Sequence, residues 1–252
     1  MSTTTTGSGQ RQPSVGEPIT ALSSVPAAGS RRGAPVVGQL RFCYGPMDCG
    51  KSTLALQIDH NHASQGRAGL LLVRHDRSGA PKISTRLGIC RDAIEVGDDT
   101  DMRELVRAHW ARGHRVDYLV VDEAQFLLSE QVDQLAELAD DVQIDVYCFG
   151  IATDFRGRLF PGSARLFELA DALQVVQVDV LCWCGLPGRF NARVIDGRIQ
   201  RDGDTVLVAD TLGDRSLSSV TNTVRYQVLC RRHFRLGDLG PAVDCGEQLS
   251  LT

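Results

Sequence analysis

The clearest chemical pattern in the sequence is a glycine-rich octapeptide, G-x-x-x-x-G-K-[ST], over Gly45 to Ser52. Its spacing lets the backbone wrap around phosphate with the N–H groups turned inward, while Lys51 reaches the outer phosphates and Ser52 is placed to bind Mg2+. A helix beginning at Lys51 would add the positive end of its dipole. The pattern predicts a nucleoside triphosphate site. The alternative is a glycine-rich turn that matches the pattern without this function.

Two neighbouring carboxylates provide the second half of such a site. Asp122 and Glu123 follow the apolar run 118–121, which reads as a strand. Because successive strand residues point in different directions, the two acids can hold different roles. We expect Asp122 to accept from the Mg2+ shell and Glu123 to take the proton of an attacking hydroxyl. The alternative is a solvated acidic pair at a strand end.

Three cysteines and a histidine have the spacing of metal ligands. Cys182 and Cys184 form a C-x-C pair, and Cys230 and His233 form a C-x-x-H pair farther along the chain. Two close pairs separated by a long loop are typical of a closed, tetrahedral Zn2+ site. We expect structural Zn2+ to close the base of the segment 185–229, which has few large apolar residues. The alternative is a set of independent buried thiols with a surface histidine.

The elements that must position these residues alternate between strand and helix. Apolar periodicity predicts strands at 39–44, 69–73, 116–121 and 142–149 and helices at 51–64, 102–112 and 129–139. Strand 69–73 reads as buried on both faces, and Ser129 reads as a helix cap. The alternation predicts an α/β, P-loop NTPase-like fold, in which helices flank a mainly parallel sheet and ligands bind at the carboxyl ends of the strands.

Composition changes along the chain divide it into four segments. The first is rich in Ser, Thr, Gly and Pro and lacks aromatic residues, so it cannot bury enough surface to order. After about residue 178 the pattern turns to Cys, Gly and short alternating runs at 205–208 and 226–229, which predict a small β-rich lobe. We therefore predict a disordered tail over 1–37, a P-loop α/β domain over 38–178, a zinc-binding lobe over 179–236 and a flexible tail over 237–252.

Bulk properties narrow the range of partners. A net charge of −4 over 252 residues disfavours nucleic acid as the main partner. The longest apolar run, 70–73, is too short to cross a bilayer, so we expect no membrane partner. The N-terminus has no apolar signal segment, and eight cysteines fit a reducing compartment. These features predict a cytoplasmic protein.

Other classes of P-loop protein fit the sequence less well. No N-K-x-D is present in the chain, which disfavours a guanine-specific switch. The run 122–125, D-E-A-Q, resembles a helicase acidic box. A helicase needs a second motor domain, however, and the roughly 130 residues that follow are too few for one.

The joint set of motifs resembles the cytosolic-type (type II) thymidine kinases, in which a P-loop α/β domain is paired with a zinc-bound lobe that carries a lasso loop. The similarity covers about 39–234 in consistent order. It rests on G-P-M-x-x-G-K-S at 45–52, D-E-x-Q-F at 122–126, the stretch 150–160, the C-x-C with the C-x-x-H, and Tyr226 four residues before Cys230.

The resemblance implies contacts to the nucleoside. Phe155 would stack on or line the thymine ring, with Met47 and Phe126 in the same pocket. Tyr226 and the backbone around 206–210 would form the lasso that hydrogen-bonds the base, although the segment 203–223 is longer and more polar than the family's lasso. The expected substrate contacts are Met47, Phe126, Phe155, Val206, Leu207, Val208 and Tyr226.

The resemblance also implies the catalytic base and the nucleotide contacts. Glu123 would be the base, and Asp76-Arg77 resembles the family's D-x-R near the triphosphate, one residue shorter here, with Arg77 stabilising charge in the transition state. The expected contacts to ATP and Mg2+ are Gly45, Pro46, Met47, Asp48, Cys49, Gly50, Lys51, Ser52, Asp76, Arg77, Asp122 and Gln125. The family further implies thymidine and ATP as substrates, dTTP as a feedback inhibitor and a homotetramer.

Two other functions stay open at the level of the sequence. A P-loop kinase or ATPase with a zinc lobe could act on another nucleoside. A zinc-ribbon interaction module on a nucleotide switch would bind ATP without multiple turnover. Arg231 and Arg232 are only a weak indication of nucleic-acid binding, because two arginines beside a metal site usually form a solvated rim.

Overall fold

The computed structural model describes residues 1, 37–74, 81–176, 178–203 and 224–241. The chain divides into two compact units, Met1–Pro35 and Val36–Thr252, and the helices and strands that the structure describes all belong to the second. Within the described ranges, no helix is both long and apolar enough to cross a membrane. The domain boundaries expected at 37, 178 and 236 stay predictions, and the strand expected at 205–208 lies outside the described residues.

The larger part of the second unit is built on a six-stranded sheet in which every pairing is parallel, in the order β5-β2-β6-β7-β1-β8. The predicted α/β fold with a mainly parallel sheet is therefore confirmed. Its strands are β1 (Leu40–Tyr44), β2 (Gly69–Val73), β5 (Ile94–Glu95), β6 (Tyr118–Asp122), β7 (Asp145–Gly150) and β8 (Ala172–Val175). A separate antiparallel pair is formed by β3 (Lys82–Ser84) and β4 (Cys90–Asp92).

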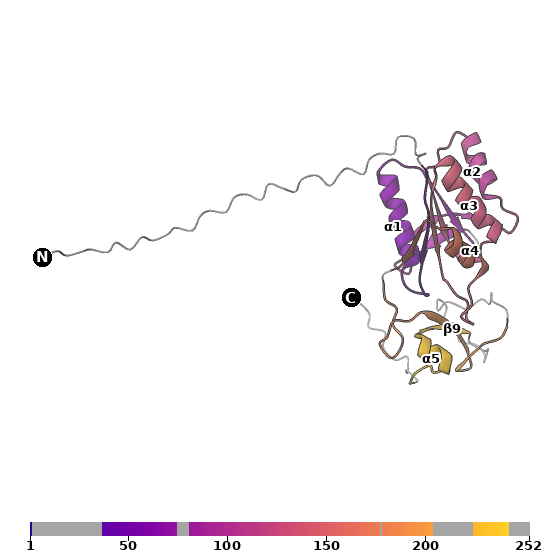
Figure 1. The fold of residues 1–252 in the computed structure, drawn as a ribbon. Helices are drawn as coiled ribbons and strands as arrows, with labels where there is room; N and C mark the ends of the chain where they lie inside the picture. The colour runs from indigo at the N-terminus through magenta and orange to yellow at the C-terminus, as the bar shows by residue number, and fades with distance from the viewer. Residues whose placement is uncertain (2–36, 75–80, 177, 204–223, 242–252) are drawn as a thin grey trace. The chain divides into compact units, whose positions relative to one another are not determined.

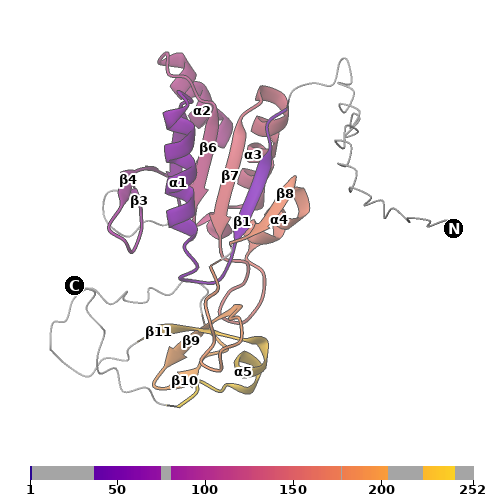
Figure 2. The same ribbon diagram turned by 90° about the vertical axis from the view of Figure 1, so that its left-hand side faces the viewer.

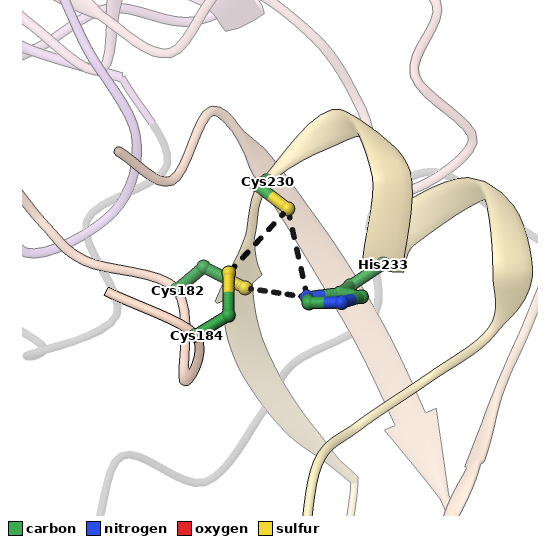
Figure 3. Close-up of side chains that lie close together, drawn as sticks. All are labelled: Cys182, Cys184, Cys230 and His233. Carbon is green, nitrogen blue, oxygen red and sulfur yellow. Dashed lines mark hydrogen bonds between the residues drawn. The ribbon is translucent and has the colours of Figure 1, made fainter. Parts of the chain in front are cut away.

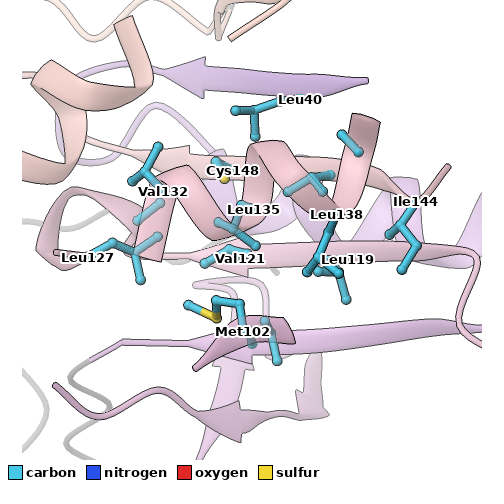
Figure 4. Packing of buried hydrophobic residues seen from close by; sticks show 14 of the residues in the cluster. Leu40, Met102, Leu119, Val121, Leu127, Val132, Leu135, Leu138, Ile144 and Cys148 are labelled. Carbon is cyan, nitrogen blue, oxygen red and sulfur yellow. The ribbon is translucent and has the colours of Figure 1, made fainter. Parts of the chain in front are cut away.

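Helices cover both faces of the sheet (Figure 1). They are α1 (Lys51–Ser64), α2 (Met102–Ala111), α3 (Ser129–Val142) and α4 (Pro161–Leu169). Alternation along β6 separates the two cores: Leu119 and Val121 are buried with residues of α2, α3 and α4, whereas Tyr118 and Val120 are buried with residues of α1. Figure 4 shows the first cluster, in which side chains of α3 pack against the strand residues.

The register of the strands brings their carboxyl ends to one edge. Tyr44 at the end of β1 is paired with Gly150 at the end of β7, and Val73 at the end of β2 is paired with Asp122 at the end of β6. Because α1 leaves the end of β1 and packs over β7 and β6, the loop before it lies at the same edge as Asp122. The fold thus positions the loop and the acidic pair together.

Several element boundaries differ from those expected. The Ser129 cap is wrong: α3 begins after Leu128, which has no capping side-chain bond, and the Leu128 N–H instead donates to Gln131 Oε1 at 3.1 Å. Strand β7 begins at Asp145 because α3 continues to Val142. Strand β2 is not buried on both faces, since Gly69 to Leu71 are half-buried. The physical reason is that its outer neighbour β5 pairs only with Leu72 and Val73.

The remaining elements form the β-rich lobe that the sequence predicts. An antiparallel sheet in the order β10-β9-β11 consists of β9 (Phe190–Ile195), β10 (Arg198–Ile199) and β11 (Arg225–Leu229), and α5 (Arg231–Leu236) follows β11 directly (Figure 2). Among the residues that the structure describes, its core cluster is small, with five buried residues: Cys182, Ala192, Leu229, Cys230 and Phe234. A core of this size is one that a bound metal ion would stabilise.

Candidate active site

The glycine-rich loop has the backbone that a phosphate cradle needs. Gly50 and Asp48 have positive φ angles of 82° and 68°, which turn the chain sharply before α1. A side chain at Gly45 would meet Cys49 Sγ at 2.5 Å, so the loop closes tightly. Lys51 is buried, and its Nζ donates to the carbonyl of Pro46 at 2.8 Å. The ammonium group therefore lies against the loop at the start of α1, where anions bind.

A direct hydrogen bond joins the loop to the acidic strand end. Ser52 Oγ donates to Asp122 Oδ2 at 2.8 Å, across residues 70 apart in the chain. Burial, and next the negative charge of Glu123, raise the pKa of Asp122 to about 6, while the bond from Ser52 opposes the shift. A hydroxyl and a carboxylate beside the phosphate cradle are the oxygen ligands that Mg2+ takes together with substrate phosphates, so the residues fit this ion.

Glu123 occupies an unusual backbone conformation at the tip of β6. Its φ of 54° lies in the left-handed region, which is costly for a residue other than glycine. Its N–H donates to Asp122 Oδ1 at 3.0 Å, and its carboxylate accepts a hydrogen bond from Gln125 Nε2. Glu123 is half-buried, so its carboxylate stays reachable beside the Ser52–Asp122 pair.

Phe155 lies in a loop that packs against the lobe. Its ring is 2% exposed, and Arg193 Cζ from β9 lies 3.4 Å from the ring centroid, which is a close cation–π contact. Tyr226 is the partner of Arg193 across the β9–β11 ladder, so the two side chains share one face of the sheet. The structure thus brings Phe155, Arg193 and Tyr226 to one place, and the roles of Phe155 and Tyr226 toward thymine stay predictions.

Phe126 follows the acidic pair in a short 3-10 helix, η1 (Ala124–Phe126). Its ring meets Phe160 edge-to-face, with centroids 5.3 Å apart. Arg74, which is buried, donates to the Phe126 carbonyl at 3.3 Å and to the Val96 carbonyl, and so holds this segment. Phe160 and Arg74 were not among the predicted site residues. Phe160 could have been found, because it ends the 150–160 stretch on which the resemblance rests.

Met47 connects the loop to the lobe through its backbone. The Met47 N–H donates to Asn191 Oδ1 of β9 at 2.8 Å, and Asn191 is 3% exposed. Sequence reasoning missed Asn191. No local signal could have found it, since the two residues are 144 positions apart.

The predicted metal ligands converge in the lobe, as Figure 3 shows. Cys182 Sγ and Cys230 Sγ lie 3.4 Å and 3.6 Å from His233 Nδ1, and Cys184 Sγ lies 4.0 Å from Cys230 Sγ. Zinc bonds of about 2.3 Å to sulfur and about 2.0 Å to nitrogen set tetrahedral ligand separations of about 3.8 Å and 3.5 Å. The four atoms therefore fit Zn2+.

Two neighbours support this cluster. Trp183 stacks on the His233 ring, with centroids 4.2 Å apart and an angle of 17°. A backbone hydrogen bond from His233 lowers the pKa of the Cys230 thiol, which favours the thiolate that binds metal. The stacking of Trp183 on His233 and the lowered pKa of Cys230 would both favour the binding of one metal ion.

Five of the predicted contacts lie outside the described residues: Asp76, Arg77, Val206, Leu207 and Val208.

The parallel sheet, the glycine-rich loop after β1 and the acid at the end of β6 define the P-loop class of nucleotide-binding α/β proteins. Comparison with known proteins then identifies the family within this class. The thymidine kinase family model matches residues 38–234. The chain therefore belongs to the thymidine kinase family, whose members are ATP-dependent phosphotransferases, and the predicted resemblance is confirmed.

Individual relatives cover most of the chain. A thymidine kinase of Streptomyces coelicolor is 51% identical over 197 residues, which span 78% of this chain and 88% of that protein. A thymidine kinase of Cutibacterium acnes is 49% identical over 204 residues, spanning 81% and 91%. A thymidine kinase of Idiomarina loihiensis is 37% identical over 201 residues, spanning 79% and 97%.

Proposed function

We propose that this protein transfers the γ-phosphoryl group of ATP to the 5′-hydroxyl of thymidine, a reaction of deoxynucleoside salvage. The observation that carries the proposal is the hydrogen bond of 2.8 Å between Ser52 Oγ and Asp122 Oδ2, which joins the phosphate loop to the strand end that bears Glu123. Membership of the thymidine kinase family supports the choice of acceptor.

In this proposal the loop residues 45–52 bind the triphosphate through backbone N–H groups, and Lys51 offsets the charge that develops on the γ-phosphoryl oxygens. Ser52 and Asp122 would hold Mg2+, which would supply positive charge to neutralise the phosphates. Positioning and electrostatics carry such a reaction, because phosphoryl transfer asks little covalent chemistry of the protein.

Glu123 is the proposed base. It accepts the proton of the 5′-hydroxyl as that oxygen bonds to the γ-phosphorus, and the bond from the γ-phosphorus to its bridging oxygen breaks with ADP as the leaving group. Met47, Phe126, Phe155 and Tyr226 are the proposed contacts to the nucleoside. The guanidinium of Arg193 lies over the Phe155 ring at 3.4 Å from its centroid, a contact that would restrain the orientation of this ring.

Several finer properties belong to the same proposal by family resemblance. They are a structural Zn2+ held by Cys182, Cys184, Cys230 and His233, feedback inhibition by dTTP, a homotetramer and a cytoplasmic location. The ligand separations in the lobe support the metal.

A panel of nucleosides tests the reaction. The purified protein with ATP and Mg2+ is incubated with thymidine, deoxycytidine, uridine or no nucleoside, and ADP and nucleoside monophosphate are quantified. We expect thymidine 5′-phosphate in amounts equal to ADP. Turnover with uridine or deoxycytidine but not thymidine would establish the alternative kinase instead, and ATP binding without turnover would establish the interaction module.

A further inference from the structure

A buried amide stands between the proposed base and the neighbouring strand. Gln125 in η1 is 1% exposed. Its Nε2 donates to Glu123 Oε2, and its Oε1 accepts from the Ile151 N–H at 3.1 Å, directly after β7. One side chain thus ties the carboxylate of Glu123 to the backbone beyond the end of the central strand β7.

The surroundings leave this amide little freedom. A side chain at Gly150 would lie 2.6 Å from Gln125 Oε1, so the glycine permits the close approach of β7. On the far side, Ser163 Oγ of α4 donates to the Ile151 carbonyl at 2.7 Å. A side chain at Gly162 would meet the Ala124 carbonyl at 2.6 Å, so α4 also presses on η1. The end of β7 and helix α4 therefore both restrict the movement of the Gln125 amide.

Glu123 needs such a restraint. Its left-handed φ of 54° is held by local contacts, including the bond from its N–H to Asp122 Oδ1, but those contacts fix the backbone rather than the carboxylate. Side-chain rotation about Cα–Cβ and beyond would swing the carboxylate away from an acceptor hydroxyl. Among the residues that the structure describes, the Gln125 amide donates a hydrogen bond to this carboxylate and so restrains the rotation.

We infer that Gln125 is a positioning residue for phosphoryl transfer: its amide holds the Glu123 carboxylate in the orientation that receives the proton of the acceptor. The inference rests on the proposed role of Glu123 and goes beyond the predicted contact of Gln125 with the nucleotide. A group that acts through Glu123 matters for the transfer step and not for the binding of ATP.

The test measures the single-turnover rate of thymidine phosphorylation in Gln125→Met, which keeps the length of the side chain and removes both polar groups. We expect the rate to fall roughly 10- to 100-fold, because a small misplacement of a reacting group costs this much. The KM for ATP should stay within about twofold. Gln131→Met is the matched control, since Gln131 is equally buried and bonds to backbone at Gly97, Thr100 and Leu128, away from the loop.

A double-mutant cycle separates positioning from packing. If Gln125 acts through Glu123, Gln125→Met changes nothing further in the Glu123→Ala background. The same loss in both backgrounds, a raised KM for ATP at unchanged rate, or an equal loss in Gln131→Met would each overturn the inference. Should Gln125→Met fail to fold, Gln125→Glu keeps the acceptor for Ile151 and removes the donor to Glu123, with the same slow rate expected. A full rate in Glu123→Ala alone would refute Glu123 as the base, on which the inference rests, whereas no thymidine phosphorylation by the unaltered protein would refute the proposed function.

Discussion

The side chain of Asn191 in the β-rich lobe accepts a hydrogen bond of 2.8 Å from the backbone N–H of Met47 in the glycine-rich loop. The bond is part-buried, and it is made by the strand that also carries Arg193 onto Phe155. Strand β9 therefore contacts both the nucleotide loop and a proposed nucleoside contact. The lobe therefore supports the loop, and in the proposed function it also covers the acceptor.

This relationship predicts an effect of the lobe on nucleotide binding. Asn191→Ala should raise the KM for ATP about fivefold, because one buried hydrogen bond is worth about 1 kcal/mol. Steady-state kinetics at saturating thymidine measures it. Asn61→Ala, an exposed asparagine of α1, is the control. A raised KM for thymidine with an unchanged KM for ATP would show that Asn191 serves the acceptor and not the loop.

The cysteine and histidine cluster predicts one bound metal ion for each chain. Elemental analysis should find about one zinc per chain, and His233→Ala should lose it and unfold at a lower temperature, because the lobe core is small. Cys90→Ser removes an exposed thiol outside the cluster and should keep the metal. A full zinc content in His233→Ala would contradict the assignment of the fourth ligand.

His62 at the end of α1 predicts a pH dependence of stability. Its Nδ1 accepts from Arg67 and its Nε2 donates to Tyr147, both at 2.9 Å, which requires the neutral ring. Burial, and next the charge of Arg67, lower the pKa of His62. As the pH falls through about 6.5, His62 therefore takes up a proton in the unfolded chain before it does so in the folded protein. The free energy by which neutral His62 stabilises the fold is present above that pH and lost below it.

The measurement is chemical denaturation at pH 7.5 and pH 5.5. His62→Gln should reduce the loss of unfolding free energy between these conditions by on the order of 0.5 kcal/mol, a small value because the site is half-buried and screened. His60→Gln, exposed on the same helix, should leave the loss unchanged. An equal loss in the wild type and in His62→Gln would exclude His62 as its source.

Asp101 predicts a local contribution to stability. Its Oδ1 accepts from the N–H groups of Arg103 at 2.8 Å and Glu104 at 3.1 Å, which caps α2. Asp101→Ala should lower the unfolding free energy by about 1 kcal/mol, and Asp101→Asn should lose less, since asparagine also caps. Thermal or urea unfolding at neutral pH measures both. Equal losses in the two variants would point to the pairing of Asp101 with Arg103 instead.

Local chemistry explains how much of the fold could be predicted. Helix 51–64 was predicted at its observed bounds because glycines stand at both ends, Gly50 before α1 and Gly66 after it, each with positive φ. The two motifs predicted that Ser52 and Asp122 serve the same Mg2+ site, but not the hydrogen bond that joins them across 70 positions. Strand β8 was missed because its sequence, A-L-Q-V, shows no regular alternation of apolar and polar residues. Helix α4 was missed although Pro161 stands at its first turn.

The missed site residues are those whose roles depend on long-range contacts. Asn191 and Arg193 lie on β9 of the lobe. Their roles come from contacts with Met47 and Phe155, which lie elsewhere in the chain. Gln125 belongs to the quoted D-E-x-Q-F motif, but its two hydrogen bonds depend on where β7 ends. Sequence spacing predicts candidate ligand contacts that lie within one local element. It does not predict which residues hold those contacts in place through tertiary packing.

The most direct test of the central claim is the rate of phosphoryl transfer in Glu123→Gln. Single-turnover thymidine phosphorylation is measured together with calorimetric binding of ATP and of thymidine. The account predicts a fall of about 10²- to 10⁴-fold in rate with both substrates still bound, because an amide cannot take the proton of the 5′-hydroxyl. A wild-type rate with both substrates bound would contradict it.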